Sequence, residues 1–293
     1  EFLQKIHARQ QGFYEILDDE ETLTKVENYA NANKNNFDHF IILGIGGSAL
    51  GPLCIQQTFG HLFQPSKLQV LDNIDPTMIA EITDAITIEK TLFIVITKSG
   101  ETPETLSQYH YFRALTDTKN LDPKNHFLFI TDPEKGQLRK IAHEENIQTF
   151  EIPPNVGGRF SVLTPVGLLP AALLGLNIRA LIQGAKTQRK KFLSENPQEN
   201  SAFQLATIQH LLNQKGKNIN ILMPYAQKLF RFADWYRQLL AESTGKENKG
   251  LTPINALGAT DQHSQTQLYN EGPNDKLIIF LELEKFAQDI SID

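Results

Sequence analysis

The most constraining feature of this sequence is a regular alternation of short apolar runs and longer amphipathic stretches. The apolar runs that are typical of strands lie at 39–44, 68–72, 92–97, 126–131 and 148–152. The stretches with helical character lie at 48–59, 76–85, 103–116 and 133–145. Strands that are apolar throughout and separated by helices are typical of a parallel sheet that helices cover on both faces. The sequence therefore predicts an α/β fold.

Chain length and the spacing of these elements indicate more than one domain. At about 150 residues per domain, a chain of this length holds roughly two. We expect a first domain over 1–152 with a helical N-terminal segment, a crossing segment with helices over 153–195, and a second domain over 196–293. The second domain has two clear strand-like runs, at 218–223 and 276–283. Two strands make a poor sheet, so we expect this domain to be incomplete in this chain.

Composition argues against several classes of protein. With 28 Lys and Arg against 34 Asp and Glu, the formal net charge is −6, which argues against binding to nucleic acid or to an anionic membrane surface. No apolar run reaches the roughly 18 residues of a membrane-spanning helix. No Cys/His cluster has zinc-site spacing, so we expect no metal. The one cysteine, Cys54, cannot form a disulfide within the chain, which favours a reducing compartment, the cytoplasm.

The turn after the first strand-like run has the residue types of an anion-binding loop. Its sequence at 43–52 is LGIGGSALGP, in which glycines allow a close backbone approach and the following helix offers free N–H groups. Gly44, Gly46 and Ala49 also fit a permissive dinucleotide fingerprint, with Asp72 where a ribose-binding acid would lie. An ordinary strand-to-helix turn with Ser48 as N-cap is a third interpretation, and this motif alone leaves all three open.

A second turn, 97–105 with the sequence TKSGETPET, places several hydroxyl groups and a lysine at the start of a predicted helix. Thr102 suits the N-cap position and Pro103 the first helical position. An ordinary capped helix explains Thr102 but leaves Thr97 and Ser99 unexplained. Hydroxyls and free N–H groups at a helix N-terminus suit a phosphate monoester, so we expect a phosphate site here.

Three later motifs supply groups for proton and charge transfer. Arg159 follows two glycines in VGGRFS, and its guanidinium can stabilise negative charge that develops on oxygen. Gln238 and Glu242 lie on one helical face, and the negative end of the helix dipole at Glu242 favours the proton uptake that a general base needs. His263 opens a helix after a loop and can exchange protons near neutrality. An ordinary surface or structural role is the alternative for each.

Together and in this order, the five motifs resemble the glucose-6-phosphate isomerase family, its bacterial branch in particular, over residues 39 to 283. The resemblance implies two sugar-isomerase (SIS) domains, each a parallel sheet flanked by helices, and a homodimer with shared active sites. It implies an aldose–ketose isomerase that interconverts glucose 6-phosphate and fructose 6-phosphate through a cis-enediol intermediate. The substrate is then a small sugar phosphate, and the reaction needs no cofactor.

The resemblance also implies roles for individual residues. The residues that would hold the substrate are Thr97, Lys98, Ser99 and Thr102 at the phosphate, with Gly47, Ser48 and Gln238 around the sugar. Lys98 is expected to act mainly through its backbone. Arg159 would stabilise the enediolate, and Glu242 would move the proton between C1 and C2. His263 would help to open the sugar ring, reaching the site from the partner subunit.

One departure from the family pattern and two alternatives accompany this interpretation. The family carries a catalytic lysine near its C-terminus, and neither Lys276 nor Lys285 stands in a matching motif, so we expect the chain to be short at this end. A non-catalytic phosphosugar-binding module would keep the phosphate turn but need not keep Arg159, Glu242 and His263. A dinucleotide-dependent oxidoreductase would use the first turn and leave the second one unexplained.

Overall fold

The computed structural model describes residues 2–288, 290 and 291, and the chain divides into two compact units after Asn200. The first unit contains a five-stranded sheet in the order β2-β1-β3-β4-β5, with every neighbouring pair parallel. Its strands are β1 (His39–Leu43), β2 (Leu68–Leu71), β3 (Thr91–Thr97), β4 (Phe127–Thr131) and β5 (Gln148–Glu151). The predicted α/β fold with a parallel sheet is confirmed.

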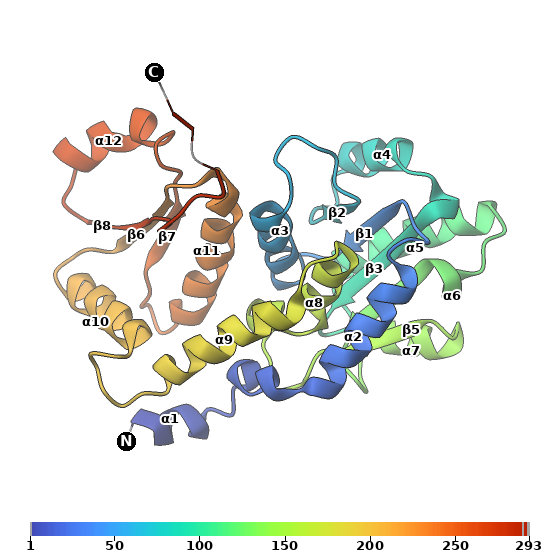
Figure 1. The fold of residues 1–293 in the computed structure, drawn as a ribbon, viewed down its shortest axis with the longest axis horizontal. Coiled ribbons are helices and arrows are strands. Elements are labelled where there is room, and N and C mark those ends of the chain that lie inside the picture. The colour runs from blue at the N-terminus through green and yellow to red at the C-terminus, as the bar shows by residue number, and fades with distance from the viewer. Residues whose placement is uncertain (1, 289, 292–293) are drawn as a thin grey trace. The chain divides into compact units, whose positions relative to one another are not determined.

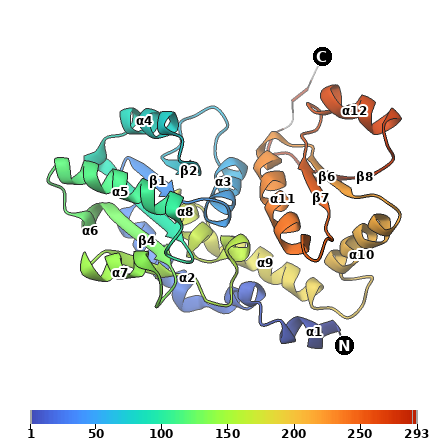
Figure 2. The same ribbon diagram turned by 180° about the vertical axis from the view of Figure 1, so that it is seen from behind.

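Helices cover both faces of this sheet, as Figures 1 and 2 show from opposite sides. The helices are α1 (Phe2–Ala8), α2 (Glu20–Asn33), α3 (Gly47–Phe59), α4 (Pro76–Ala85), α5 (Pro103–Thr118), α6 (Pro123–His126), α7 (Gln137–Glu144), α8 (Pro165–Leu173) and α9 (Ile178–Phe192). The 3₁₀ turns are η1 (Gly12–Tyr14), η2 (Ile16–Asp18), η3 (Ile88–Lys90) and η4 (Gly158–Leu163).

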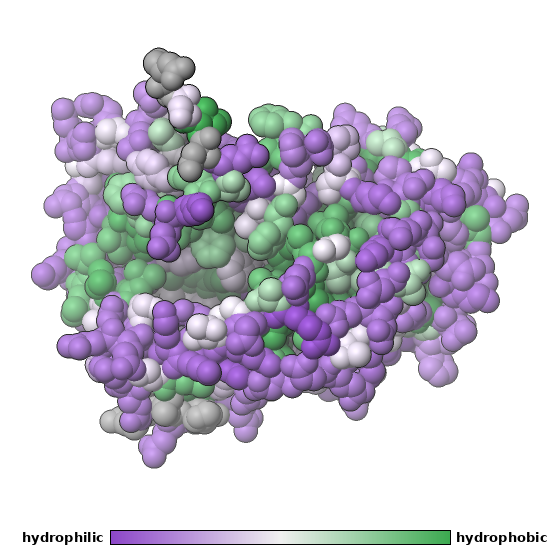
Figure 3. Space-filling view, in the orientation of Figure 1, coloured by the Kyte–Doolittle hydropathy of each residue, from purple (hydrophilic) through white to green (hydrophobic). Residues whose placement is uncertain are grey.

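Alternate residues of each strand enter two separate cores, because successive side chains in a strand point to opposite faces. In β3, Ile94 and Ile96 pack in the core shared with α2, α3, α8 and α9, whereas Phe93 and Val95 pack in the core beneath α4, α5 and α7. All four are fully buried. The outer surfaces of α2 and α9 are largely hydrophilic (Figure 3). This double burial explains why the strands are apolar throughout.

Two helix starts differ from the sequence-based expectation. Helix α7 begins at Gln137 rather than near residue 133, because Asp132 Oδ1 accepts hydrogen bonds from the backbone N–H groups of Glu134 and Lys135 and folds these residues into a turn. The Glu134 N–H bond is also the main reason why the pKa of Asp132 lies below its ordinary value. Helix α3 begins at Gly47 after Gly46, so Ser48 lies inside the helix and is not its N-cap.

The second unit contains a three-stranded parallel sheet in the order β7-β6-β8. Its elements are α10 (Ser201–Gln214), β6 (Ile219–Pro224), η5 (Gln227–Leu229), α11 (Phe230–Thr244), β7 (Thr252–Asn255), α12 (Gln262–Glu271) and β8 (Lys276–Leu281). Strand β7 was not predicted from the sequence. This strand is short and contains Pro253, which lacks the N–H that an inner strand needs but is tolerated at a sheet edge.

Among the described residues, no helix is both long enough and apolar enough to cross a bilayer.

Candidate active site

Three hydroxyl groups converge where β3 ends and α5 begins. Thr97, the last residue of β3, is almost fully buried, and its Oγ1 lies 2.7 Å from Thr102 Oγ1 and 3.3 Å from Ser99 Oγ. Ser99 Oγ also accepts a hydrogen bond from the Glu101 N–H. Thr102 occupies the N-cap position, as expected, but its side chain makes no capping bond because its hydroxyl contacts Thr97. We call residues 97–102 the phosphate loop, after the phosphate site that was expected here.

Two glycines with left-handed backbones fix the shape of the phosphate loop. Gly100 has a φ of +69° and donates its N–H to the Thr97 carbonyl oxygen. Gly136, with a φ of +93°, lies directly against the loop, and a Cβ atom added there would come within 2.2 Å of the Ser99 carbonyl oxygen. The Leu138 N–H bonds to the Gly100 carbonyl oxygen at 3.0 Å. The loop after β4 therefore supports the loop after β3.

The Lys98 side chain turns away from the three hydroxyls. Its Nζ donates a hydrogen bond of 2.8 Å to the Pro154 carbonyl oxygen, and its own carbonyl oxygen accepts from the Asp132 N–H. Lys98 thus ties the phosphate loop to the crossing segment after β5. The ammonium group is therefore held by the crossing segment, and the role expected of the Lys98 backbone toward a ligand stays a prediction.

The glycine turn after β1 lies beside the phosphate loop, because β1 pairs with β3 along its length. Gly47 packs so closely on the crossing segment that an added Cβ would lie 2.4 Å from the Gly158 carbonyl oxygen and 2.7 Å from the Arg159 nitrogen. Ser48, the next residue of α3, is partly buried. The structure therefore brings the first and third sequence motifs into direct backbone contact.

Arg159 lies in η4 and is partly buried. Its guanidinium carbon lies 4.4 Å from the centroid of the Phe160 ring. On the same turn, Ser161 Oγ donates a 2.6 Å hydrogen bond to the Gly158 carbonyl oxygen, which closes η4. Phe160 in turn stacks on Phe13 of the N-terminal segment, with ring centroids 5.0 Å apart. This stack carried no signal in the sequence, because its two rings come from residues that lie far apart along the chain.

In the second unit, Gln238 and Glu242 share one face of α11, as their spacing predicts. Gln238 Nε2 donates to Glu242 Oε2 at 3.2 Å, and Glu242 is exposed in the last turn of the helix. Gln238 Oε1 is buried and has no hydrogen-bond partner in the described structure. One turn earlier, buried Asp234 accepts hydrogen bonds from Asn255 Nδ2 and Arg231 Nη1, and the Asn255 bond attaches α11 to β7.

His263 is exposed at the second position of α12, after a loop, as expected. Asp261 fixes this loop by accepting hydrogen bonds from the Leu257 N–H and the Ser264 hydroxyl. Among the residues that the structure describes, His263 shares no hydrogen bond or ion pair with Gln238 or Glu242. Thus the phosphate loop, the glycine turn and Arg159 are joined within the first unit, and the Gln238–Glu242 pair is joined within the second.

No group of three or more His, Cys, Asp and Glu side chains suited to a metal ion occurs in the described part of the chain.

A family model and several named relatives place the chain in one family. A family model described as phosphoglucose isomerase matches residues 14–268. The chain is 49% identical over 296 aligned residues to a glucose-6-phosphate isomerase of Carboxydothermus hydrogenoformans, covering 93% of this chain and 63% of that protein. It therefore spans somewhat less than two thirds of that relative.

Two solved structures resemble the chain. One, described as a hypothetical protein from Thermus thermophilus, has a TM-score of 0.91 at 35% identity, over 97% of this chain and 69% of that one. The other, a glucose-6-phosphate isomerase from Chlamydia trachomatis, has a TM-score of 0.79 at 25% identity, over 89% of this chain and 52% of that one.

Proposed function

This chain belongs to the phosphoglucose isomerase family, and from that premise we propose that it interconverts glucose 6-phosphate and fructose 6-phosphate. Its two units then correspond to two sugar-isomerase domains. The observation that carries the proposal is the arrangement at the carboxyl ends of β1 and β3 in the first sheet. There the hydroxyls of the phosphate loop stand beside a glycine turn that packs against the backbone of Arg159.

The substrate phosphate would bind to the phosphate loop. The Ser99 and Thr102 hydroxyls and the first N–H groups of α5 offer donors at the positive end of a helix dipole. Thr97 links these hydroxyls, and Lys98 contributes its backbone N–H. Because the net charge of the chain is −6, attraction of a phosphate has to come from such local donors rather than from the overall field.

Isomerisation would proceed by proton transfer between C1 and C2 through a cis-enediol. Glu242 takes the proton from one carbon and returns it to the other, with Gln238 as its hydrogen-bonded neighbour. Arg159 stabilises the oxygen that becomes negative, since its guanidinium stays charged and offers several donors. Gly47 and Ser48 line the sugar. This sequence of steps needs no metal and no redox cofactor.

Ring opening would use His263, and we propose that it acts in the site of a second subunit. The protein is then a homodimer with shared active sites. We place it in the cytoplasm, where a single thiol stays reduced. Cys54 is buried, and burial raises the pKa of its thiol to about 11, so the group is protonated and unreactive near neutrality.

The test is whether the chain converts fructose 6-phosphate. The sugar is monitored directly by ¹³C NMR, so the reaction mixture needs no dinucleotide. We expect glucose 6-phosphate to form in the presence of EDTA, with solvent deuterium entering at C2. Arg159→Ala is the matched control and should bind the sugar phosphate but not convert it. Binding without conversion by the unaltered chain would favour the non-catalytic module instead. Absence of both binding and conversion would refute the proposal.

A further inference from the structure

The guanidinium of Arg159 rests on a column of aromatic rings. Arg159 lies over Phe160 at 4.4 Å from the ring centroid. Phe160 stacks on Phe13 at 5.0 Å, with an angle of 24° between the ring planes. Phe13 in turn contacts Tyr14 edge-on at 5.1 Å and Phe192 of α9 at 6.5 Å. The column therefore runs from a residue of the candidate site to the N-terminal segment, which contributes no strand to the sheet.

The Phe160 ring has little room to move within this column. A Cβ atom added to Gly157 would lie only 3.2 Å from Phe160 Cδ2, so the ring rests directly above the Gly157 backbone. Phe13 lies against the ring as a near-parallel stack. On the Phe13 side, the neighbouring Gly12 donates its N–H to the Asn155 carbonyl oxygen at 2.9 Å. One backbone bond thus holds Phe13 next to the turn that carries Arg159.

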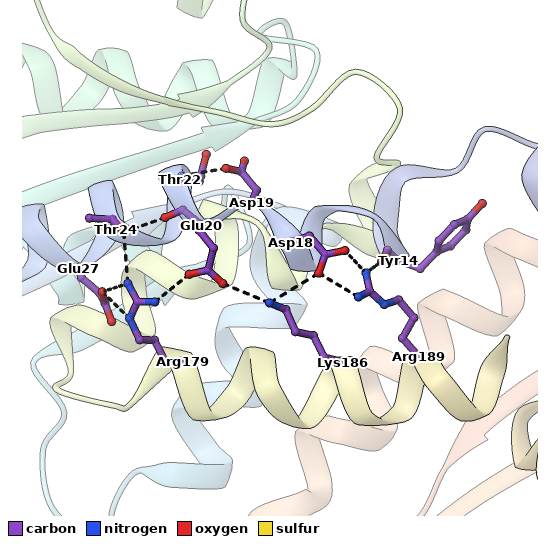
Figure 4. A network of polar contacts seen from close by, with 10 residues as sticks. All are labelled: Tyr14, Asp18, Asp19, Glu20, Thr22, Thr24, Glu27, Arg179, Lys186 and Arg189. Atoms are coloured by element: carbon purple, nitrogen blue, oxygen red, sulfur yellow. Dashed lines mark hydrogen bonds and ion pairs between the residues drawn. The ribbon is translucent and has the colours of Figure 1, made fainter.

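A network of charged side chains holds the chain from Tyr14, the residue after Phe13, to Glu27 against α9 (Figure 4). Arg189 of α9 donates to the Tyr14 carbonyl oxygen at 2.9 Å and to both Asp18 oxygens at 2.6 and 2.9 Å. The Arg189 guanidinium holds the pKa of Asp18 below its ordinary value. The network continues along α9 through the pairs Lys186–Asp18, Lys186–Glu20, Arg179–Glu20 and Arg179–Glu27. Single exposed pairs contribute little, but this network fastens a whole segment to one helix.

We propose that Phe13 is a positioning residue for Arg159 and acts through the Phe160 ring. The inference rests on the proposed function, in which Arg159 meets the enediolate. An arginine side chain is long and loses much freedom when it must hold one orientation. Stacking on an aromatic face fixes the guanidinium plane while leaving its N–H donors at the edge available. The N-terminal segment is then part of the catalytic apparatus and not only a cover for the sheet.

The positioning itself is tested by NMR on the chain labelled with ¹⁵N-arginine. In Phe13→Leu, the Arg159 Nε–H signal should lose the upfield shift caused by the Phe160 ring, and its order parameter should fall. Phe13→Tyr keeps a ring and should retain both. Phe37→Leu is the matched control, because Phe37 lies just before β1, at the end of the strands opposite the phosphate loop, where its ring contacts Phe40 and His126. An unchanged Arg159 signal in Phe13→Leu would overturn the proposal.

Its catalytic consequence is tested by a double-mutant cycle with Arg159→Lys. We expect Phe13→Leu to lower kcat about 10- to 100-fold, the loss that a misplacement of about 1 Å can cause, with KM nearly unchanged. In the Arg159→Lys background, Phe13→Leu should have almost no further effect, since it acts only through the guanidinium. Equal losses in both backgrounds would show a merely structural role and overturn the proposal.

Affinity measurements with two sugar-phosphate analogues separate this proposal from the proposed function. The probe is a five-carbon sugar-acid phosphate, whose carboxylate stands in for the enediolate oxygens. Its affinity should fall in Phe13→Leu, whereas the affinity for a sugar-alcohol phosphate without that charge should stay constant. One outcome would show that the role assigned to Arg159 is wrong while Phe13 still positions its side chain. In that outcome, Arg159→Lys leaves turnover and binding of the carboxylate probe intact, whereas Phe13→Leu still removes the upfield shift of the Arg159 Nε–H signal and lowers its order parameter.

Discussion

Gly136→Ala tests whether the loop after β4 determines the shape of the phosphate loop. Gly136 has a φ of +93° and a ψ of 158°, a backbone conformation that is essentially restricted to glycine. A Cβ atom there would lie 2.2 Å from the Ser99 carbonyl oxygen and 2.8 Å from Gly100 Cα. Both are backbone atoms, so the overlap cannot be relieved by rotating a side chain. Either the phosphate loop moves or the strain remains.

The magnitude follows from two contributions. Holding a non-glycine residue in this conformation costs about 1–3 kcal/mol, and overpacking against fixed neighbours typically costs about 1–3 kcal/mol more. A total of at least about 2 kcal/mol should lower the unfolding temperature by at least about 4 °C. If Ser99 shifts and one bond to the ligand phosphate is lost, at about 1.5–3 kcal/mol for a charged partner, affinity should fall about 10- to 100-fold.

The chain offers controls that separate the two contributions. Gly175 has a φ of +80° but open space around it, so Gly175→Ala introduces strain without overlap. Gly184 lies in α9 with a helical backbone and nothing near an added Cβ, so Gly184→Ala should stabilise the chain slightly. Each variant is assayed by thermal unfolding and by titration with fructose 6-phosphate. Equal unfolding temperatures for Gly136→Ala and Gly175→Ala, with phosphosugar affinity unchanged in both, would refute the reasoning.

Three further predictions concern the proposed chemistry. Removing both hydroxyls in Ser99→Ala/Thr102→Ala should weaken binding of inorganic phosphate and raise KM, and unchanged values of both would place the phosphate elsewhere. Glu242→Gln keeps the shape but cannot accept a proton, so exchange of the substrate C2 hydrogen should fall by about 10²–10⁴-fold, while calorimetry should find binding nearly intact. Mixing inactive Arg159→Ala with inactive His263→Ala should restore about a quarter of the activity after complete subunit exchange, if His263 serves the other subunit; a mixture that stays inactive would contradict shared sites.

The parts that could be predicted from the sequence are those in which local residue types decide the outcome. Strands buried on both faces must be apolar throughout, and those of the first sheet were found on that basis. The cluster of hydroxyls at Thr97, Ser99 and Thr102 could be predicted because these residues lie within six positions at the end of one strand, and its phosphate-binding role stays a prediction. Strand β7 was missed because its four residues, with a proline among them, carry no apolar run. Gly136 and Phe13 were missed because each matters only through a contact with a distant part of the chain.

The glycine turn after β1 shows how far a local pattern can decide between functions. Its glycines predict a close backbone approach but not the group that approaches, so a dinucleotide remained an alternative in the sequence. In the structure, the group against Gly47 is the Gly158–Arg159 backbone, within 2.4–2.7 Å of where a Cβ would lie. A glycine in the turn that fits a dinucleotide fingerprint is therefore also required by a backbone contact within the chain, and the local pattern alone does not separate the two roles.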